Sequence, residues 1–390
     1  GRVGHSEVMG IVIPDNLGAR MAEHRQFFAL AVESLELPAV LRGLERFRDR
    51  LYPCDDDRHD PQWHRPGEDC PGPSMVSEVI PLPAGAALLV DAGDLPKQFL
   101  HLLPDALREE LAAAGVSSAT VRLAEDSHVH EVVLGARNAV LLVAVGRQDP
   151  ARRRPLQPVP AHWADLGLAW LGDGPKEASV DLVDVGSVSD ASVCAVTRAS
   201  AAAVSVVSVG PGSSVRLFYT SPSQLWPYVV FGAAGDDLHG EQRLQVVDDL
   251  VALARRLAPE VAQAFLDFQP DFRRVGGPYR PPHPPIDPAK PHKTPTMQTE
   301  HAILGSEILF EAFPYMVLTQ HHVDRLGGAV DVHRIEGVEP ARYEVRFDPL
   351  DDWLPDSPRH DDAVLAARAA LAPAIMTTTE ALWETRSRRA

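Results

Sequence analysis

The spacing of apolar and polar positions in the first 150 residues predicts a mixture of helices and strands. Residues 24–35, HRQFFALAVESL, are typical of a helix, and residues 38–51 repeat apolar side chains every three or four positions after Pro38. The stretches VSEVIPLP, AALLVDAG, ATVRLAE and AVLLVAVGR predict strands, and LPDALREELAAAG predicts a helix that ends at Gly115. Strands and helices do not alternate regularly enough to predict a doubly wound parallel sheet.

Residues 160–275 have the pattern of an antiparallel sheet followed by a long helix. Short β-branched runs joined by brief polar turns predict strands at VDLVDV, SVCAVTRA, AVSVVSV, SVRLFYT and YVVFGAA. Apolar positions from Leu244 to Phe268 fall on one helical stripe, in which Pro259 either kinks the helix or starts a second one. We therefore expect this helix to lie across one face of the sheet.

Proline marks the strongest boundary along the chain. Residues 276–300 are too rich in proline for a helix or a central strand, so we expect an extended linker or a wrapping arm. Residues 301–390 predict an apolar helix over 307–328, a strand at ARYEVRF, an acidic loop, and a final helix at DDAVLAARAALAPAI. The predicted fold class is α+β, with antiparallel sheets flanked by helices in units 1–150, 160–275 and 301–390.

Charge narrows the classes of partner. The 390 residues carry a formal net charge of −17, which repels nucleic acid and anionic membranes. No apolar run is long enough to span a bilayer, and the first residues do not resemble a secretory signal. Three cysteines are too few for a disulfide framework, so we expect a protein of a reducing cytoplasm. The bias toward Ala, Arg, Val and Asp is typical of a GC-rich bacterial genome, so we expect a bacterial source.

One stretch between two cysteines, CDDDRHDPQWHRPGEDC from Cys54 to Cys70, concentrates acidic residues and histidines. Its cysteines are too far apart for a zinc knuckle, and its carboxylates lack the spacing of a calcium loop. We interpret it as an acidic loop, with a metal site or a redox disulfide between Cys54 and Cys70 as the alternatives.

Two pairs of residues, His128 with His130 and His322 with Asp324, are candidate ligands of a divalent metal. His128 and His130 share one face if SHVHEVVLG is a strand. His322 and Asp324 have the residue types of a facial metal triad, but a helix that ends at Gly327 explains them equally well. Nucleophile elbows and phosphate-binding loops are missing from the sequence.

Two further segments are candidate surfaces for a partner. LFYTSPSQLWPYVVF contains Trp226 and Tyr228, which either pack in the core or anchor an interface. DPLDDWLPDSPRHDD, residues 348–362, contains six aspartates and one arginine and includes Asp351, Asp352 and Trp353. Such an acidic run is either a solvated face or a contact for a basic protein.

Two functions are compatible with these patterns. The first is a non-catalytic binding protein, of the adaptor, chaperone or immunity type, whose acidic surface attracts a basic protein partner. The second is a metal-dependent enzyme that assembles histidines and carboxylates from distant segments. The sequence leaves open whether the chain is an enzyme, because it contains no complete catalytic pattern.

Overall fold

The structure is a computed structural model. It describes residues 10–19, 27–51, 79–82, 85–91, 102–124, 136–147, 159–180, 183–198, 203–210, 214–222, 227–272, 279–285, 297, 304–377, 380–381 and 387. The fold is α+β and rich in antiparallel strand pairs, as the sequence predicts. The chain divides into two compact units, Gly1–His130 with Pro175–Val206 and Glu131–Gly174 with Val207–Ala390. The segment boundaries predicted from the sequence stay predictions, because much of residues 273–303 lies outside the described residues.

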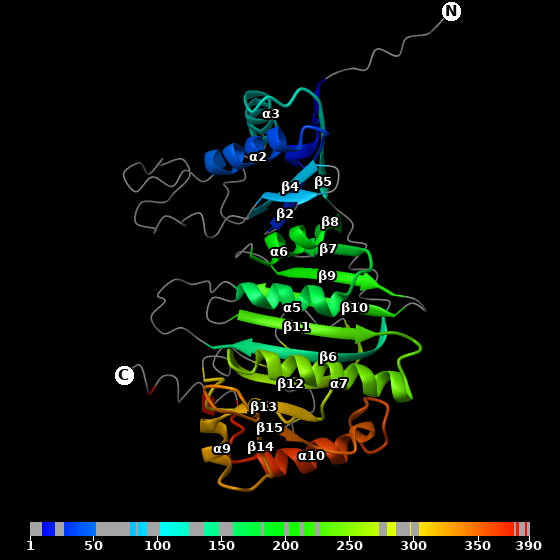
Figure 1. Cartoon of the computed structure of the whole chain (residues 1–390), viewed down its shortest axis with the longest axis vertical. Helices are drawn as coiled ribbons and strands as arrows, with labels where there is room; N and C mark the ends of the chain where they lie inside the picture. The colour runs from blue at the N-terminus through cyan, green and yellow to red at the C-terminus, as the bar shows by residue number, and fades with distance from the viewer. Residues whose placement is uncertain are drawn as a thin grey trace, which may run out of the picture. The chain divides into compact units, whose positions relative to one another are not determined.

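The first unit contains a sheet with the strand order β1-β5-β2-β4-β3. These strands are β1 (Ile11–Val12), β5 (Ala119–Ala124), β2 (Phe27–Glu33), β4 (Gly85–Asp91) and β3 (Val79–Leu82). Helices α2 (Leu37–Leu51) and α3 (Leu103–Ala113) lie side by side and share a core with this sheet (Figure 1). The helices approach closely because Gly43 has no side chain, and an added Cβ would lie 2.9 Å from Leu111 Cδ2.

Two predicted elements of this unit have the opposite secondary structure. Residues 27–33, predicted as helix, form β2 between β4 and β5. SVCAVTRA, predicted as a strand, belongs to helix α6 (Asp190–Arg198), which follows the hairpin of β7 (Lys176–Val180) and β8 (Val183–Val188). The hydroxyl of Ser189 accepts a hydrogen bond from Ser192 N–H at 3.2 Å, so a capping serine outweighs β-branched propensity here.

The second unit contains an antiparallel sheet with the order β14-β15-β13-β12-β6-β11-β10, followed by β9 (Val204–Val209), of which residues 207–209 belong to this unit. The strands are β14 (His333–Arg334), β15 (Arg342–Arg346), β13 (Tyr315–Thr319), β12 (Val261–Asp271), β6 (Arg137–Gly146), β11 (Pro227–Ala234) and β10 (Val215–Pro222). In register, Phe265 of β12 lies opposite Val143 of β6. The central pair β6–β12 is almost entirely buried.

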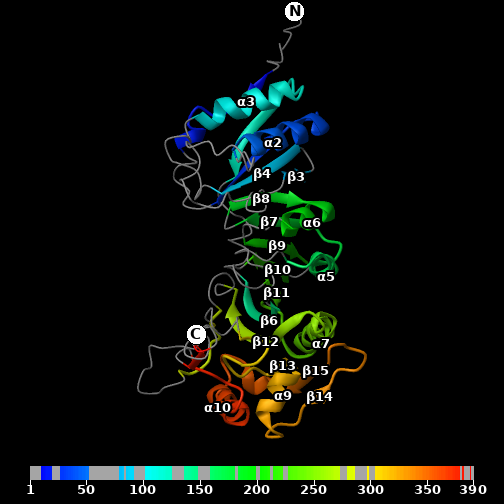
Figure 2. The same cartoon turned by 90° about the vertical axis from the view of Figure 1, so that its left-hand side faces the viewer.

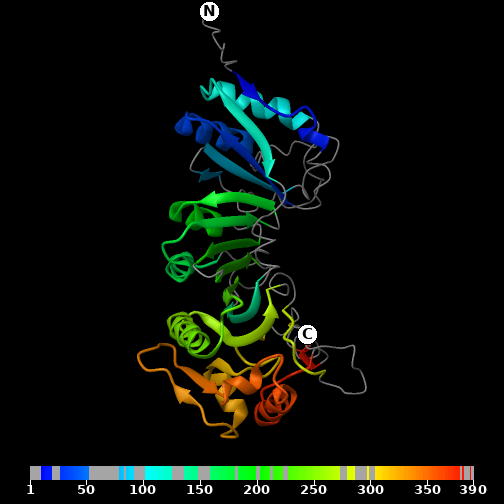
Figure 3. The same cartoon turned by 90° about the vertical axis from the view of Figure 1, so that its right-hand side faces the viewer.

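Helices cover both faces of this sheet. They are α5 (Ala161–Leu171), α7 (Gly240–Leu257), α9 (Gln320–Leu326) and α10 (His360–Leu371), with a 3₁₀ turn, η4 (Leu350–Trp353). Figures 2 and 3 show α5 and α7 on one face and α10 on the other. The buried side of α7 carries Val247, Leu250 and Leu257, so the predicted stripe faces the sheet from Val247 onward, whereas Leu244 is exposed.

Two helices predicted in this unit are shorter than expected. The stripe from Leu244 to Phe268 ends as helix at Leu257, and its second half is strand β12. The helix predicted over residues 307–328 contains strand β13 and only the short helix α9. Both strands have paired neighbours on each edge and are buried, so their apolar runs lack the alternation that identifies a half-exposed strand. Among the described residues, no helix has the length and apolar character needed to cross a membrane.

Candidate functional site

The acidic loop, residues 348–362, is fixed to the fold by buried side chains. Trp353 of η4 is 2% exposed, and Leu350 and His360 are also buried. The ring of Trp353 lies beside that of His283, with 5.9 Å between centroids. An acidic run of this kind is often a mobile solvated segment, but here three of its side chains are buried in the core and fix its position.

The aspartates of the acidic loop differ in their partners. Asp348 pairs with Arg346 at 3.0 Å, and Asp352 pairs with Arg359 at 3.5 Å. The other four, Asp351, Asp356, Asp361 and Asp362, are exposed, and none forms an ion pair with a described residue. The anchored loop therefore presents four uncompensated carboxylates to solvent.

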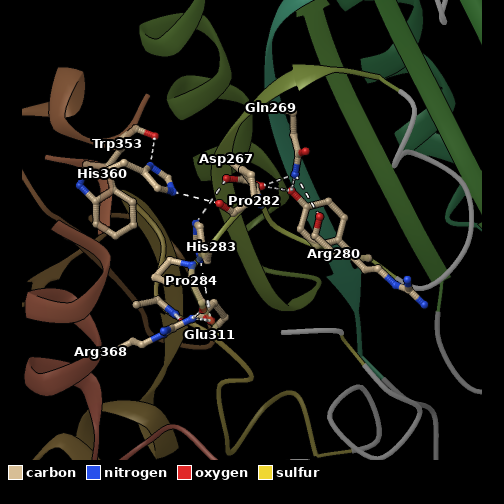
Figure 4. Close-up of polar contacts among 12 residues, drawn as sticks. Asp267, Gln269, Arg280, Pro282, His283, Pro284, Glu311, Trp353, His360 and Arg368 are labelled. Carbon is tan, nitrogen blue, oxygen red and sulfur yellow. Dashed lines mark hydrogen bonds and ion pairs between the residues drawn. The ribbon is translucent and has the colours of Figure 1, made fainter. Parts of the chain in front are cut away.

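His360 joins the acidic loop to the proline-rich segment at residues 279–285. Its Nδ1 lies 3.0 Å from the carbonyl oxygen of Trp353, and its Nε2 lies 3.1 Å from that of Pro282 (Figure 4). A neutral imidazole has a single N–H, so both carbonyls receive hydrogen bonds only when both ring nitrogens carry protons. One buried side chain thus links two segments that are far apart in the sequence.

Arg368 of α10 makes a second link to the same segment. Its Nε donates to Glu311 Oε1 at 2.7 Å, and its Nη2 donates both to Glu311 Oε2 and to the carbonyl oxygen of Pro284 at 2.7 Å. Glu311 is 1% exposed. Burial raises the pKa of Glu311, but the Arg368 hydrogen bonds and the nearby His283 outweigh burial and leave the pKa below its ordinary value.

His283 lies between two buried carboxylates. Its Nε2 is 3.7 Å from Asp267 Oδ1 and its Nδ1 is 3.8 Å from Glu311 Oε2, and both distances are too long for hydrogen bonds. These contacts are ion pairs when the ring carries its second proton. The side chain of His283 is completely buried, so the ring joins the β12 side of the cluster to the α10 side.

Asp267 of β12 is the other carboxylate of this cluster. It accepts a short hydrogen bond from the Tyr279 hydroxyl and one of 2.7 Å from Gln269 Nε2. Burial raises the pKa of Asp267 despite these donors and the nearby His283. Burial also raises the pKa of Tyr279 well above the usual value for a phenol, so this side chain stays a neutral donor. We refer to Asp267, Tyr279, His283, Glu311, His360 and Arg368 as the buried polar cluster.

The aromatic residues predicted to meet a partner have structural roles here. Tyr228 is 5% exposed, and its ring meets that of Tyr219 edge to face, with 6.0 Å between centroids. Trp353 is buried as described above. Both side chains are part of the core. Of the neighbouring aspartates, Asp351 is exposed, whereas Asp352 is only 19% exposed and pairs with Arg359. Trp226 lies outside the described residues.

The metal ligands predicted at α9 also have local partners. His322 is fully buried, accepts from Thr319 N–H at Nδ1 over 3.0 Å, and has Nε2 3.2 Å from the carbonyl oxygen of Ile308. Burial lowers the pKa of His322 to about 4, which keeps the ring neutral. Asp324 accepts from Gln320 at 2.7 Å on the same helix. His322 thus completes a capping box with Thr319 at the start of α9.

The remaining metal predictions lie outside the described residues. These are His128, His130 and the whole stretch from Cys54 to Cys70. Within the part of the chain that is described, no group of three or more histidines, cysteines and carboxylates is arranged to hold a metal ion. The metal-dependent enzyme stays a prediction about the other residues.

Comparison with protein-family models, with curated proteins and with solved structures found no match. The function is therefore inferred from the geometry of the chain itself. The side chains of the buried polar cluster are largely inaccessible to solvent, and they hold segments of the fold together. The acidic loop, in contrast, carries four carboxylates that are exposed to solvent.

Proposed function

We propose that this chain acts in the cytoplasm as a non-catalytic binding protein whose acidic loop recognises a basic protein partner. The observation that supports the proposal most is the anchored loop itself. Four exposed aspartates without ion-pair partners among the described residues stand on a segment held by Leu350, Trp353 and His360. A preorganised loop loses little conformational entropy when it binds, so its charges favour a specific partner more than a mobile acidic run would.

The net charge supports the same proposal over longer distances. A formal charge of −17 steers a cationic protein toward the molecule and raises the rate of encounter. Screening shortens this attraction to about 10 Å at 0.1 M salt, so the association rate of the partner should fall as salt rises.

The test compares two triple variants with the same change in net charge. The loop variant carries Asp351→Asn, Asp361→Asn and Asp362→Asn, and leaves Asp356 in place. The matched control carries Asp173→Asn, Asp248→Asn and Glu336→Gln, all exposed, and none of them belongs to the turn after β11 or the start of α7, which lie beside residues 354–356.

Each protein is immobilised and used to capture partners from the source cells, and the captured proteins are quantified by mass spectrometry. We expect a basic protein that wild type and control retain at equal levels and that the loop variant loses by about tenfold or more, equivalent to about 1.4 kcal/mol. The association rate of that protein with wild type should then fall with added salt. Equal capture by all three proteins, or a rate that is independent of salt, would refute the proposal.

A further inference from the structure

A cavity of about 400 Å³ lies within the second unit, at one end of its sheet. The start of β6 and the end of β12 line it, and in register Phe268 lies opposite Val140 and Gln269 opposite Ala139. The turn after β11, the first turns of α7 and residues 354–356 complete the lining. A volume of this size falls in the lower part of the range of about 300–1,000 Å³ for small-molecule sites.

The lining combines two cationic and two anionic side chains. Arg137, on β6, is 55% exposed and has Nη1 3.7 Å from Asp271 Oδ2, which is a loose contact. Arg243, on α7, has Nη2 3.3 Å from the His239 ring. Asp236 and Asp356 are exposed, and neither pairs with any residue in the described ranges. The cavity is therefore neutral overall but strongly polar, and its apolar walls include Phe268 and Leu354.

Two independent features distinguish this cavity from an ordinary surface hollow. Asn138 of the lining has a φ of 54°, and it is the one residue other than glycine with a positive φ in the described part of the chain. Such backbone strain concentrates at functional sites. Gln269 is 1% exposed, and its Oε1 accepts no hydrogen bond from a described residue. Figure 4 shows its amide nitrogen turned toward Asp267 and its oxygen turned away.

We propose that this cavity binds a small zwitterion of the α-amino acid class, with the carboxylate on Arg137 and Arg243 and the ammonium on Asp236 and Asp356. A simple anion would face two carboxylates, and a simple cation would face two guanidinium groups. A zwitterion matches both pairs, and guanidinium groups bind a carboxylate through paired N–H donors. The apolar walls would contact the ligand side chain. This site goes beyond the proposed protein partner. It shares Asp356 with the acidic loop, but Arg137, Arg243 and Asp236 lie outside the loop, and the triple loop variant leaves Asp356 in place.

The first experiment screens the standard L-amino acids, each at about 10 mM, for a rise in the melting temperature of the full chain, because a ligand of the folded state stabilises it by mass action. Titration calorimetry then measures the affinity of the best amino acid. The same ligand is tested as its N-acetyl derivative, which lacks the ammonium, and as its carboxamide, which lacks the carboxylate. We expect a Kd below about 1 mM and a loss of about tenfold or more for each derivative.

Single substitutions in the cavity lining test which side chains bind the ligand. Arg243→Gln and Asp236→Asn should each weaken binding by about tenfold. Arg334→Gln and Asp331→Asn, which change exposed residues of the same unit outside the lining, should leave it unchanged. The inference is overturned if no amino acid binds, if the derivatives bind as tightly as the parent, or if the lining variants bind like the controls. The derivative test uses wild type alone, so it decides the question even if a variant does not fold.

Discussion

Replacing Arg368 with methionine tests whether the buried polar cluster holds the acidic loop in place. Arg368 is 13% exposed and makes two hydrogen bonds to Glu311 and one to Pro284. Methionine keeps much of the apolar stem, so the change removes the charge and the donors more than the packing. Removing one partner of a buried ion pair costs about 3–5 kcal/mol, because the other charge stays buried without compensation. We expect a loss in this range, because Glu311 has almost no contact with solvent.

The matched control is Arg359→Met, which breaks the ion pair with Asp352. That pair spans 3.5 Å, and the side chain of Arg359 is 69% exposed, so the expected cost is about 0–1 kcal/mol. Urea unfolding measures the total change in stability, and hydrogen exchange of the amides in η4 and α10 measures the local change. If Arg368→Met costs no more than the control, or if exchange in η4 is unaltered, the cluster does not anchor the loop.

The loss of stability caused by Arg368→Met should depend on pH. In wild type the folded-state pKa of Glu311 lies below its ordinary value of 4.5, so this carboxylate stabilises the fold above pH 4.5 and loses that contribution as the pH falls through the folded value. Without Arg368, burial favours the protonated acid. The stability difference between wild type and variant should therefore be largest at neutral pH and narrow as the pH approaches 4.5. A difference independent of pH would contradict the assignment to Glu311.

Two further predictions concern single residues elsewhere in the second unit. His322 stays neutral in the folded state down to a pKa of about 4, whereas the unfolded residue titrates near 6.5, so unfolding takes up a proton between these values. The unfolding free energy of wild type should fall by up to about 1.4 kcal/mol for each unit by which the pH is lowered through that window. Urea titrations of His322→Gln at several pH values should lack this slope. Gly167 of α5 packs against Phe218 of β10, and an added Cβ would lie 2.7 Å from the ring. Gly167→Ala should cost about 1–3 kcal/mol in the same unfolding assay, whereas an unchanged stability would show that α5 can shift away from the sheet.

Local patterns predicted many elements correctly but failed where strands are buried on both faces. Helices α2 and α10 each keep one exposed face, so their apolar stripes were informative. Strands β2, β12 and β13 have neighbours on both edges and apolar runs that resemble a helical stripe. For β12 a useful pattern was present, because Asp267, Gln269 and Asp271 alternate along the strand and lie on one face.

The candidate site was harder to predict from the sequence than the helices and strands were. The acidic loop was recognisable in the sequence from its six aspartates, and the net charge by itself was reason to expect a basic partner. Its anchoring was not recognisable, because the cluster joins Asp267, His283, Glu311 and Arg368 from segments that are far apart in the chain. The cavity likewise combines residues near 137, 236, 243, 269 and 356. Composition and periodicity describe each segment and its neighbours, whereas burial, ion pairing and the lining of a cavity arise only when folding brings distant segments together.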